Sequence, residues 1–462
     1  MGDRLILADG IEFSTDEKKT HINSNICIVG TTGGGKTLNL IQPRLLYNRN
    51  TNLVISDPKR ELIEKYRYFY ECLGFKVLEL NISNPNLADV CFDPMQYVDR
   101  HKDVNVLSRA IVDLTPQRPN SIADCYWEHS SCSVTKFAVY YKLAIDGGET
   151  TLVDVVDFID SLEIDENNTL MRTNVDSVVE EIRQNMPDHP MLAPYNSFKT
   201  APIRTAGSIF TTIKTTLSNV FSENIKRVIN EKDTLDLDKF TKEKCILFIT
   251  ADGSDEYEDA FINLIFDMLI QQLTKIADGY PEQRLPIPVH FIFDDFAAGT
   301  KISSFPRQIS KFRSKNMSST IVLQSETQLE GMYGEADAKT IINNNDTIIY
   351  LGGNDVKTAG DIAIRLNYPI EDVLYMPLEQ ICIFRRGAKP IIAKKYPTLQ
   401  DKMFIKLNHD YKNQLSKDDK KQENNELSSC EVNLDDKELS EEELQAELEA
   451  KFDELFGPIE AE

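Results

Sequence analysis

Residues 26–37 read ICIVGTTGGGKT, an apolar run that leads directly into a glycine-rich turn. The last eight residues, Gly30 to Thr37, fit the pattern G-x-x-x-x-G-K-[ST], and a helical pattern follows from Lys36 to Leu46. A strand, a glycine-rich turn and a helix in this order are typical of a phosphate-binding loop. The stretch therefore predicts an α/β fold with a phosphate site at the end of a buried strand.

Each residue type in this turn has a role in binding a nucleotide phosphate. Glycines let successive backbone N–H groups converge on a β-phosphate. The Lys36 ammonium is expected to reach the β- and γ-phosphate oxygens, and the Thr37 hydroxyl to ligate Mg²⁺. The alternative is a glycine-rich turn without a ligand, against which the flanking strand and helix argue. The predicted nucleotide-binding residues are Gly30, Thr31, Thr32, Gly33, Gly34, Gly35, Lys36 and Thr37.

A second chemical signal lies in HFIFDDFAAGT, residues 290–300, where an apolar run ends in the adjacent carboxylates Asp294 and Asp295. Beside a phosphate loop, the first acid of such a pair holds magnesium and the second polarises the attacking water. Without that loop, the pair could equally cap a helix or form a turn. We therefore interpret Asp294 as the metal-side acid and Asp295 as the catalytic acid.

The remaining apolar runs divide the chain into domains. A strand-like run ends at Asp57, and further runs follow at 245–250, 289–293, 319–323 and 347–352. Between about Val98 and Thr200 the periodicity is helical, which predicts an all-helical insertion. The predicted division is 1–97 for the first part of the nucleotide-binding domain, 98–200 for the insertion, 201–408 for its second part and 409–462 for an acidic tail.

Composition places the chain among globular proteins. It has 462 residues and 41% apolar content, which suffices for two or three domains with a substantial core. No signal-peptide pattern is present, and no apolar run approaches the roughly 18 residues of a membrane-spanning helix, so a soluble protein is expected. The eight cysteines are scattered without a CxxC pair, which argues against a disulfide framework and a zinc site.

The net charge of -23 is concentrated at the C-terminal end, where 17 acidic and 5 basic residues follow from Asn413 onward. Basic residues form only small clusters, as at 311–315 and 385–389, so composition alone does not indicate nucleic-acid binding. The polar segment from about His409 to Lys437 is expected to be disordered. A short amphipathic helix is predicted between Ser440 and Gly457, either as a solvated helix without a partner or as a docking peptide.

The order of the motifs resembles the type IV coupling proteins, the TraG/TraD-like ATPases that connect DNA and protein substrates with conjugation and type IV secretion channels. The resemblance covers most of residues 23–395. It rests on GTTGGGKT, on ISDPKRELIEKY at 55–66, on YWEHS around Trp127, on RTAGSIFTTIKTTL at 204–217, and on the block from PVHFIFDD to TIINNNDTIIYLGGND at 288–355.

This resemblance implies a RecA-like P-loop ATPase that uses ATP and Mg²⁺, with a helical domain inserted after the second strand. It also implies a ring of six subunits with ATP at the interfaces. By position, Lys36, Thr37, Asp294 and Asp295 take the roles described above. Gln324 corresponds to the sensor of the γ-phosphate. Arg313 corresponds to an arginine finger that reaches into the neighbouring subunit; the alternative is a solvated arginine on a helix.

Three departures from the family pattern affect these expectations. Asp295 replaces a glutamate, and a reach shorter by about 1 Å can lower the hydrolysis rate by about 100-fold. Many relatives carry N-terminal transmembrane helices, and this sequence shows none before its phosphate loop. Arg60 stands where the family has glycine, which puts the conformation of that turn in doubt.

Three functions follow as hypotheses. The first is an ATP-hydrolysing coupling protein that links a relaxase-bound DNA substrate to a type IV secretion channel. The second is a nucleotide-dependent recruitment platform with little hydrolysis, and the third is an FtsK/HerA-like DNA translocase, against which the scarcity of basic clusters argues. The expected location is the cytoplasm, with attachment to the inner face of the cell membrane through a membrane-protein partner.

Overall fold

The structure is a computed structural model that describes residues 3–99, 101–114, 122–163, 173–230, 234–251, 256–296 and 301–412. The chain divides into two compact units, Met1–Ile405 and Lys406–Glu462. In the second unit the described residues, 406–412, are helical. The rest of the predicted disordered segment and the predicted helix after Ser440 lie outside the described residues.

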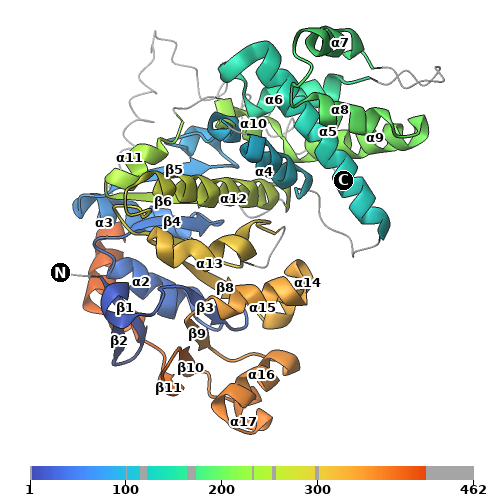
Figure 1. Ribbon diagram of the computed structural model, residues 1–462. Coiled ribbons are helices and arrows are strands. Elements are labelled where there is room, and N and C mark those ends of the chain that lie inside the picture. Colours follow the sequence, from blue (N-terminus) through green and yellow to red (C-terminus); the bar gives the residue numbers. More distant parts are fainter. Residues whose placement is uncertain are drawn as a thin grey trace, which may run out of the picture. The chain divides into compact units, whose positions relative to one another are not determined.

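A nine-stranded sheet forms the centre of the first unit, in the order β11-β10-β9-β3-β8-β7-β4-β6-β5 (Figure 1). The seven strands from β9 to β5 run parallel, and β10 and β11 add an antiparallel edge. Their bounds are β3 Ile26–Val29, β4 Asn52–Asp57, β5 Lys76–Asn81, β6 Cys245–Thr250, β7 Val289–Phe293, β8 Met317–Leu323, β9 Thr347–Tyr350, β10 Gln380–Arg385 and β11 Ile391–Lys394. A separate hairpin pairs β1 (Arg4–Ala8) with β2 (Ile11–Ser14).

Helices connect the strands and cover the sheet. Because parallel neighbours need crossover connections, each central strand leads into a helix before the next one begins. Outside the insertion the helices are α1 Glu17–Thr20, α2 Gln42–Leu46, α3 Glu61–Cys72, α12 Glu256–Gly279, α13 Phe305–Lys315, α14 Glu326–Tyr333, α15 Glu335–Asn343, α16 Val356–Leu366 and α17 Ile370–Leu374. A π-helical turn, Thr37–Ile41, precedes α2 directly.

The helical insertion lies between β5 and β6. Figure 1 shows most of its helices gathered at one end of the sheet. They are α4 His101–Val112, α5 Ile122–Asp146, α6 Leu152–Ser161, α7 Asp176–Asn185, α8 Leu192–Lys199, α9 Ile203–Val220, α10 Glu223–Asn230 and α11 Leu237–Lys242. The predicted boundary at residue 200 falls between α8 and α9, within this run of helices.

The position of the insertion corrects one expectation, because it follows the third strand of the sheet rather than the second. The missed strand, β5, reads KVLELN, in which the charged residues Lys76 and Glu79 interrupt the apolar run. It is an edge strand, and Glu79 is nevertheless fully buried there. Sequence periodicity does not reveal such a strand. The arginines that form ion pairs with its buried glutamate, Arg60 and Arg67, lie outside the strand.

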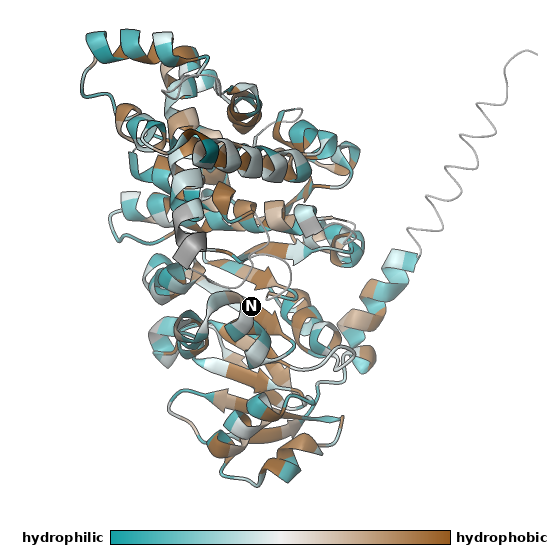
Figure 2. Cartoon of the chain, turned by 90° about the vertical axis from the view of Figure 1, so that its right-hand side faces the viewer, coloured by the Kyte–Doolittle hydropathy of each residue, from teal (hydrophilic) through white to brown (hydrophobic). Residues whose placement is uncertain are grey.

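The antiparallel edge strands β10 and β11 were not predicted either, whereas the core explains why buried parallel strands were predicted well. The predicted strands at 245–250 and 289–293 coincide with β6 and β7, all of whose residues are buried. Strands covered by helices on both faces are apolar throughout rather than alternating. Figure 2 shows this arrangement, with strands coloured as hydrophobic and helices that carry hydrophilic residues outward.

One helix among the described residues is long and apolar enough to span a membrane by length and composition, the Tyr257–Gly279 part of α12. Of its apolar window, 78% is buried inside the fold. Phe261 packs edge-on against Phe221, and Phe266 against Phe293 of β7. These contacts are those of a core helix between the sheet and the insertion.

Candidate nucleotide site

The glycine-rich loop occupies the carboxyl edge of the sheet, directly after β3. Gly33 and Gly35 have φ angles of 76° and 83°, in the left-handed region that glycine adopts without strain. A Cβ atom on Gly35 would clash with the side-chain amide of Asn39. The Lys36 ammonium donates a hydrogen bond to the Gly30 carbonyl at 2.7 Å, so the lysine lies inside the curve of the loop.

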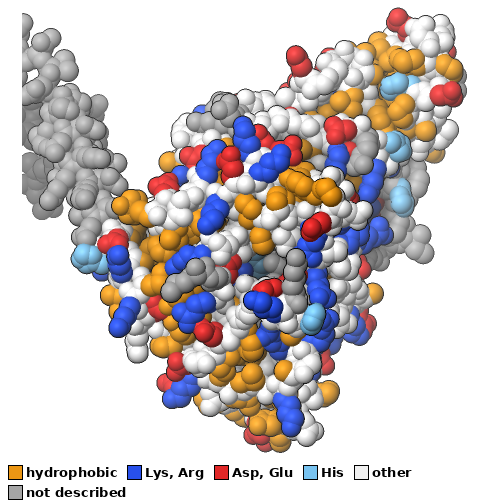
Figure 3. Space-filling view, turned by 60° about the vertical axis from the view of Figure 1, so that its left-hand side comes forward, with side chains coloured by type: hydrophobic (Ala, Val, Ile, Leu, Met, Phe, Trp, Pro, Cys, Tyr) orange, Lys and Arg blue, Asp and Glu red, His pale blue; other side chains and the backbone are white. Residues whose placement is uncertain are grey.

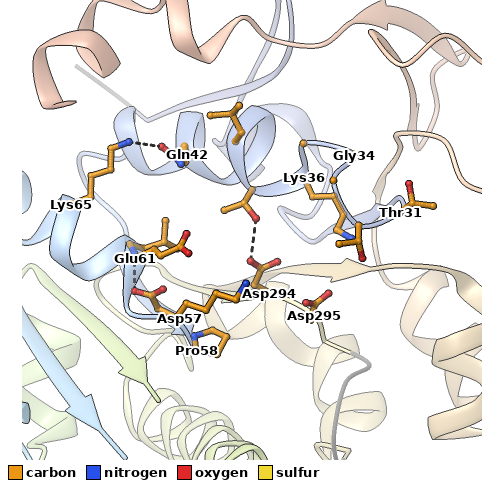
Figure 4. Close-up of a pocket in the computed structure, with 17 residues that line it drawn as sticks. Thr31, Gly34, Lys36, Gln42, Asp57, Pro58, Glu61, Lys65, Asp294 and Asp295 are labelled. Carbon is orange, nitrogen blue, oxygen red and sulfur yellow. Dashed lines mark hydrogen bonds between the residues drawn. The ribbon is translucent and has the colours of Figure 1, made fainter. Parts of the chain in front are cut away.

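The two predicted acids lie beside this loop although more than 250 residues separate them from it. The strand order β3-β8-β7 places the ends of these strands at one edge of the sheet. The Thr37 hydroxyl donates to an Asp294 carboxylate oxygen at 3.1 Å. Thr37, Lys36, Asp294 and Asp295 all line one cleft of about 540 Å³ (Figure 4). The structure thus brings the two sequence motifs together.

Electrostatics couples the lysine to the acid pair. Burial lowers the pKa of Lys36, and Asp295 and Asp294 oppose this shift. Burial, followed by the charge of Asp295, raises the pKa of Asp294, while the hydrogen bond from Thr37 opposes the shift. A cation bound between Thr37 and Asp294 would oppose both effects on the aspartate, so the site favours positive charge at this point.

Asp295 differs from Asp294 in backbone conformation. Its φ is 52°, in the left-handed region, and its side chain is exposed. Aspartate and asparagine occupy this region several-fold more often than other non-glycine residues. The turn after β7 therefore suits aspartate, which accounts locally for the residue found where the family has glutamate.

Sequence reasoning missed that the turn after β4 forms a further wall of the cleft. Asp57, Pro58, Lys59 and Glu61 all line it. The Asp57 carboxylate accepts hydrogen bonds from the backbone N–H groups of residues 62 and 63, at 2.9 and 2.8 Å, and so caps α3. Burial raises the pKa of Asp57 to about 6. A polar run directly after a second parallel strand was the available signal, because parallel strands end at a common edge.

The doubt about Arg60 is resolved in this turn. Arg60 has φ 60° and ψ 11°, the left-handed conformation that a glycine would adopt there. Its Nε and Nη2 donate to the two carboxylate oxygens of Glu79 at 2.6 and 3.0 Å, and its Nη1 lies 2.9 Å from Glu64. The bidentate ion pair fixes the guanidinium and stabilises a backbone conformation that is unfavourable for arginine.

Glu79 joins the turn to the edge of the sheet. Besides Arg60, it accepts hydrogen bonds from Arg67 at 3.1 Å, Asn81 at 2.9 Å and Thr250 at 2.9 Å. Burial raises the pKa of Glu79, but the hydrogen bonds from Arg60, Asn81 and Thr250 outweigh burial, and the pKa is lowered. The glutamate is therefore ionised at neutral pH despite being buried.

Two further lysines contact the rim of the cleft. Lys65 lines it from α3, donates to the Gln42 side chain at 3.2 Å and lies 3.8 Å from the ring centre of Phe404. Burial lowers its pKa to about 8. The Lys395 ammonium, just beyond β11, donates to the Gly34 carbonyl at 2.8 Å. The C-terminal strands thus reach the phosphate loop.

Gln324 and Arg313 occupy different edges of the sheet. Gln324 follows β8 directly, and because β8 pairs with β3 and β7, the residue emerges between the phosphate loop and the acid pair. Its side chain is exposed. Arg313 lies near the C-terminal end of α13, also exposed, where the chain enters the amino end of β8. Neither Gln324 nor Arg313 lines the cleft of its own chain.

Comparison with solved structures shows the same architecture. The coupling protein TrwB, solved in complex with ADP and Mg²⁺, is 16% identical, with a TM-score of 0.63 over 86% of this chain and 89% of that one. Its unbound monoclinic form has a TM-score of 0.60 at 16% identity, over 84% and 87%. VirB4 of Thermoanaerobacter pseudethanolicus gives 0.51 at 15% identity, over 87% and 98%. The predicted RecA-like P-loop fold with its helical insertion is confirmed.

Sequence comparison supplies the family. No curated protein matches the chain significantly. Residues 5–367 match the family described as type IV secretory system conjugative DNA transfer. This match includes the phosphate loop, the turn after β4, the helical insertion and the acid pair. The chain therefore belongs to the conjugative DNA-transfer family of type IV secretion systems, the coupling proteins.

Proposed function

We propose that the chain binds ATP with Mg²⁺ in this cleft and hydrolyses it, in order to link DNA and protein transfer substrates to a type IV secretion channel. One observation carries the proposal. The Thr37 hydroxyl and the Asp294 carboxylate meet at 3.1 Å beside Lys36, at the start of a helix and in a cleft of about 540 Å³. Related TrwB structures contain ADP with Mg²⁺ and an ATP analogue.

The side chains present fit a magnesium ion. Mg²⁺ prefers hard oxygen ligands and usually binds one or two protein groups together with phosphate oxygens. Thr37 and Asp294 offer a hydroxyl and a carboxylate oxygen on neighbouring elements. When bound, the ion would neutralise charge on the phosphate oxygens.

We assign a separate role in ATP hydrolysis to each residue of the site. The loop from Gly30 to Gly35 supplies backbone N–H groups for the phosphates, and Lys36 exchanges the Gly30 carbonyl for phosphate oxygens. Asp295 accepts a hydrogen bond from the attacking water and orients it. Gln324 senses the γ-phosphate from the end of β8. Because Asp295 is short, we expect slow turnover.

Catalysis at subunit interfaces is a further part of the proposal; the exposed position of Arg313 outside the cleft of its own chain is compatible with a role in a neighbouring subunit. In a ring of six, this arginine would stabilise phosphate charge in the neighbouring subunit. Mixing Lys36→Ala and Arg313→Ala subunits should then restore activity at interfaces that carry neither change. Mixed rings, verified by mass, that show no recovery would contradict this role.

The decisive experiment is a single-turnover ATPase assay on assembled protein, with and without DNA and transfer partners. Asp295→Asn should retain nucleotide binding and lose hydrolysis, because the phosphate contacts remain while the base is removed. Asp295→Glu separates two cases: a faster single turnover indicates that the short reach of Asp295 limits hydrolysis, whereas a slower one indicates that the left-handed backbone is adapted to aspartate. Wild-type hydrolysis no faster than that of Asp295→Asn would favour the recruitment platform instead.

The recruitment platform is the second candidate, and the exposed, shortened Asp295 favours it. The translocase is disfavoured by the scarcity of basic clusters in the sequence. On the one face that Figure 3 shows, acidic and apolar side chains are present together with Lys and Arg. A protein that tracks DNA would be expected to present a basic stripe.

The remaining partners and the domain division are part of the same proposal. Relaxase-bound DNA and channel components are the substrate and the acceptor. We include attachment to the inner face of the membrane through a membrane-protein partner in the same proposal. We divide the chain into 1–97, 98–200, 201–408 and 409–462. Removal of residues after 408 should preserve nucleotide binding and abolish recruitment of at least one transfer partner.

A further inference from the structure

A second cavity, of about 420 Å³, lies at the opposite edge of the sheet from the nucleotide cleft. It forms where β4, β7 and β8 begin, as shown by the lining residues Thr51, Pro288 and Met317. Residues between β2 and β3 complete the wall, among them Glu17. The cavity is large enough for a small ligand and far larger than the volume of one water molecule.

Arg44 of α2 lines this cavity with an unpaired charge. The residue is 5% exposed, and its Nε and Nη1 have no hydrogen-bond acceptor among the described residues. No carboxylate of the described residues forms an ion pair with it. Buried guanidinium N–H groups without an acceptor destabilise a fold. Burial lowers the pKa of Arg44, and the charge of nearby Asp3 opposes this shift.

The groups nearest to Arg44 cannot supply the missing acceptor, because they are engaged elsewhere. The Asp3 carboxylate accepts hydrogen bonds from the backbone N–H groups of residues 49 and 50, at 2.8 and 2.9 Å, and from the Thr51 hydroxyl. Fully buried His290 has its two ring nitrogens 2.7 and 2.8 Å from the hydroxyls of Ser318 and Thr320.

Side chains of both signs line the same cavity: besides Arg44, the bases are Arg284 and Lys19, and the acids are Asp3, Asp16 and Glu17. Arg284 donates to the neutral side chain of Asn316 at 3.0 Å and, within the described residues, forms no ion pair. Glu17 accepts from the backbone N–H of Ser24 at 3.0 Å through Oε1, whereas its buried Oε2 has no partner. Burial raises the pKa of Glu17, while the hydrogen bond from Ser24 and the charge of Arg284 oppose this shift.

We propose that this cavity is a binding site for a phosphate-type oxyanion, held by Arg44 and Arg284. Guanidinium groups bind phosphate oxygens in a bidentate manner, and the ligand would supply the acceptors that Arg44 Nε and Nη1 lack. The site is separate from the phosphate loop and does not depend on the proposed ATPase function.

The test must first remove phosphate binding by the loop from Gly30 to Thr37, because this loop is also expected to bind oxyanions. We would therefore titrate the full chain carrying Lys36→Ala with inorganic phosphate at constant ionic strength, and follow thermal unfolding and calorimetric heat. One phosphate site should remain. Adding Arg284→Gln, at a half-buried position that tolerates the change, should weaken phosphate binding by about tenfold or more, because charged hydrogen bonds are lost. Arg183→Gln, at a half-buried position of α7 outside the lining of this cavity, is the matched control and should leave phosphate binding unchanged.

Arg44→Met provides an independent measurement, because it should abolish phosphate binding without lowering the unfolding temperature of the phosphate-free protein. Without phosphate, this variant should unfold at the same or a higher temperature than the Lys36→Ala parent, because an unpaired buried charge has been replaced by an apolar side chain of similar length. Stabilisation by phosphate should be abolished. A deoxynucleoside monophosphate titrated in parallel separates the sources, since tighter binding than inorganic phosphate assigns the site to a phosphomonoester. Absence of a phosphate site in Lys36→Ala, or equal binding by all variants, would overturn the proposal.

Discussion

Two turns border the nucleotide cleft and adopt the same unusual backbone conformation by different means. In the loop from Gly30 to Thr37, the left-handed positions are Gly33 and Gly35. In the turn from Asp57 to Glu61, the left-handed position is Arg60, held by a buried glutamate. The local sequence specifies the left-handed positions of the first turn, because they are glycines. The left-handed position of the second turn depends on Glu79, which lies beside Arg60 only in the folded sheet. Changes in the first turn should therefore affect ligand binding, and changes in the second should affect stability.

The largest expected effect is the loss of nucleotide binding in Lys36→Ala. Its ammonium is the only cation of the loop itself, and without it the β- and γ-phosphate charge loses its main partner. We expect an affinity loss of about 100-fold or more, with little change in the unfolding temperature. Titration with labelled ATP measures the first quantity. An unchanged affinity would contradict the assigned role of the loop.

The second turn should respond in stability instead. Glu79→Ala removes the shared acceptor of Arg60 and Arg67, and we expect a loss of about 2–3 kcal/mol in the free energy of unfolding. Glu79→Gln retains the shape and should lose less. Because the pKa of Glu79 is lowered in the folded state, its contribution is present near neutral pH and is lost as pH falls through that pKa. Urea unfolding at pH 7 and pH 4 tests both statements; equal loss in both variants would contradict them.

A reciprocal pair of substitutions compares the two turns directly. Gly35→Ala introduces a Cβ into a left-handed position, at a strain of about 1–2 kcal/mol, and should weaken ATP binding about tenfold. Arg60→Gly relieves comparable strain but removes charged hydrogen bonds, so we expect a net destabilisation of about 1 kcal/mol. Its effect on ATP affinity should be smaller than that of Gly35→Ala. If Arg60→Gly stabilises the protein, the ion pair does not hold the turn.

The smallest effect concerns pH. Burial lowers the pKa of Lys65 to about 8, so its ammonium is charged below this pH and neutral above it. The affinity for ATP should fall about threefold as pH rises from 7 to 9, because the cleft loses a cation on a half-exposed wall. Lys65→Arg remains charged and should lose this component of the pH profile. Identical profiles for both proteins would show that Lys65 does not interact with the ligand.

The comparison of the turns also explains how far the sequence could predict the fold. Buried parallel strands such as β6 and β7 are apolar throughout and were predicted with their observed bounds. Strand β5 was missed, because Glu79 reads as an exposed residue unless its partners are known. The phosphate loop and the acid pair were predicted from spacing alone. The wall formed by Asp57, Glu61 and Lys65 was not predicted to belong to the site.

The sequence by itself determined the features whose physics is local. Glycines at fixed spacing specify the loop, apolar runs specify most of the buried strands, and adjacent acids after such a run specify the acidic wall of the cleft. Only the tertiary structure decided which separated segments meet. The order of the parallel strands brings Asp294 to Thr37, and burial against β5 allows Arg60 to adopt a glycine conformation. Contacts between distant segments follow from the packing of the whole sheet, and no single stretch of the sequence contains them.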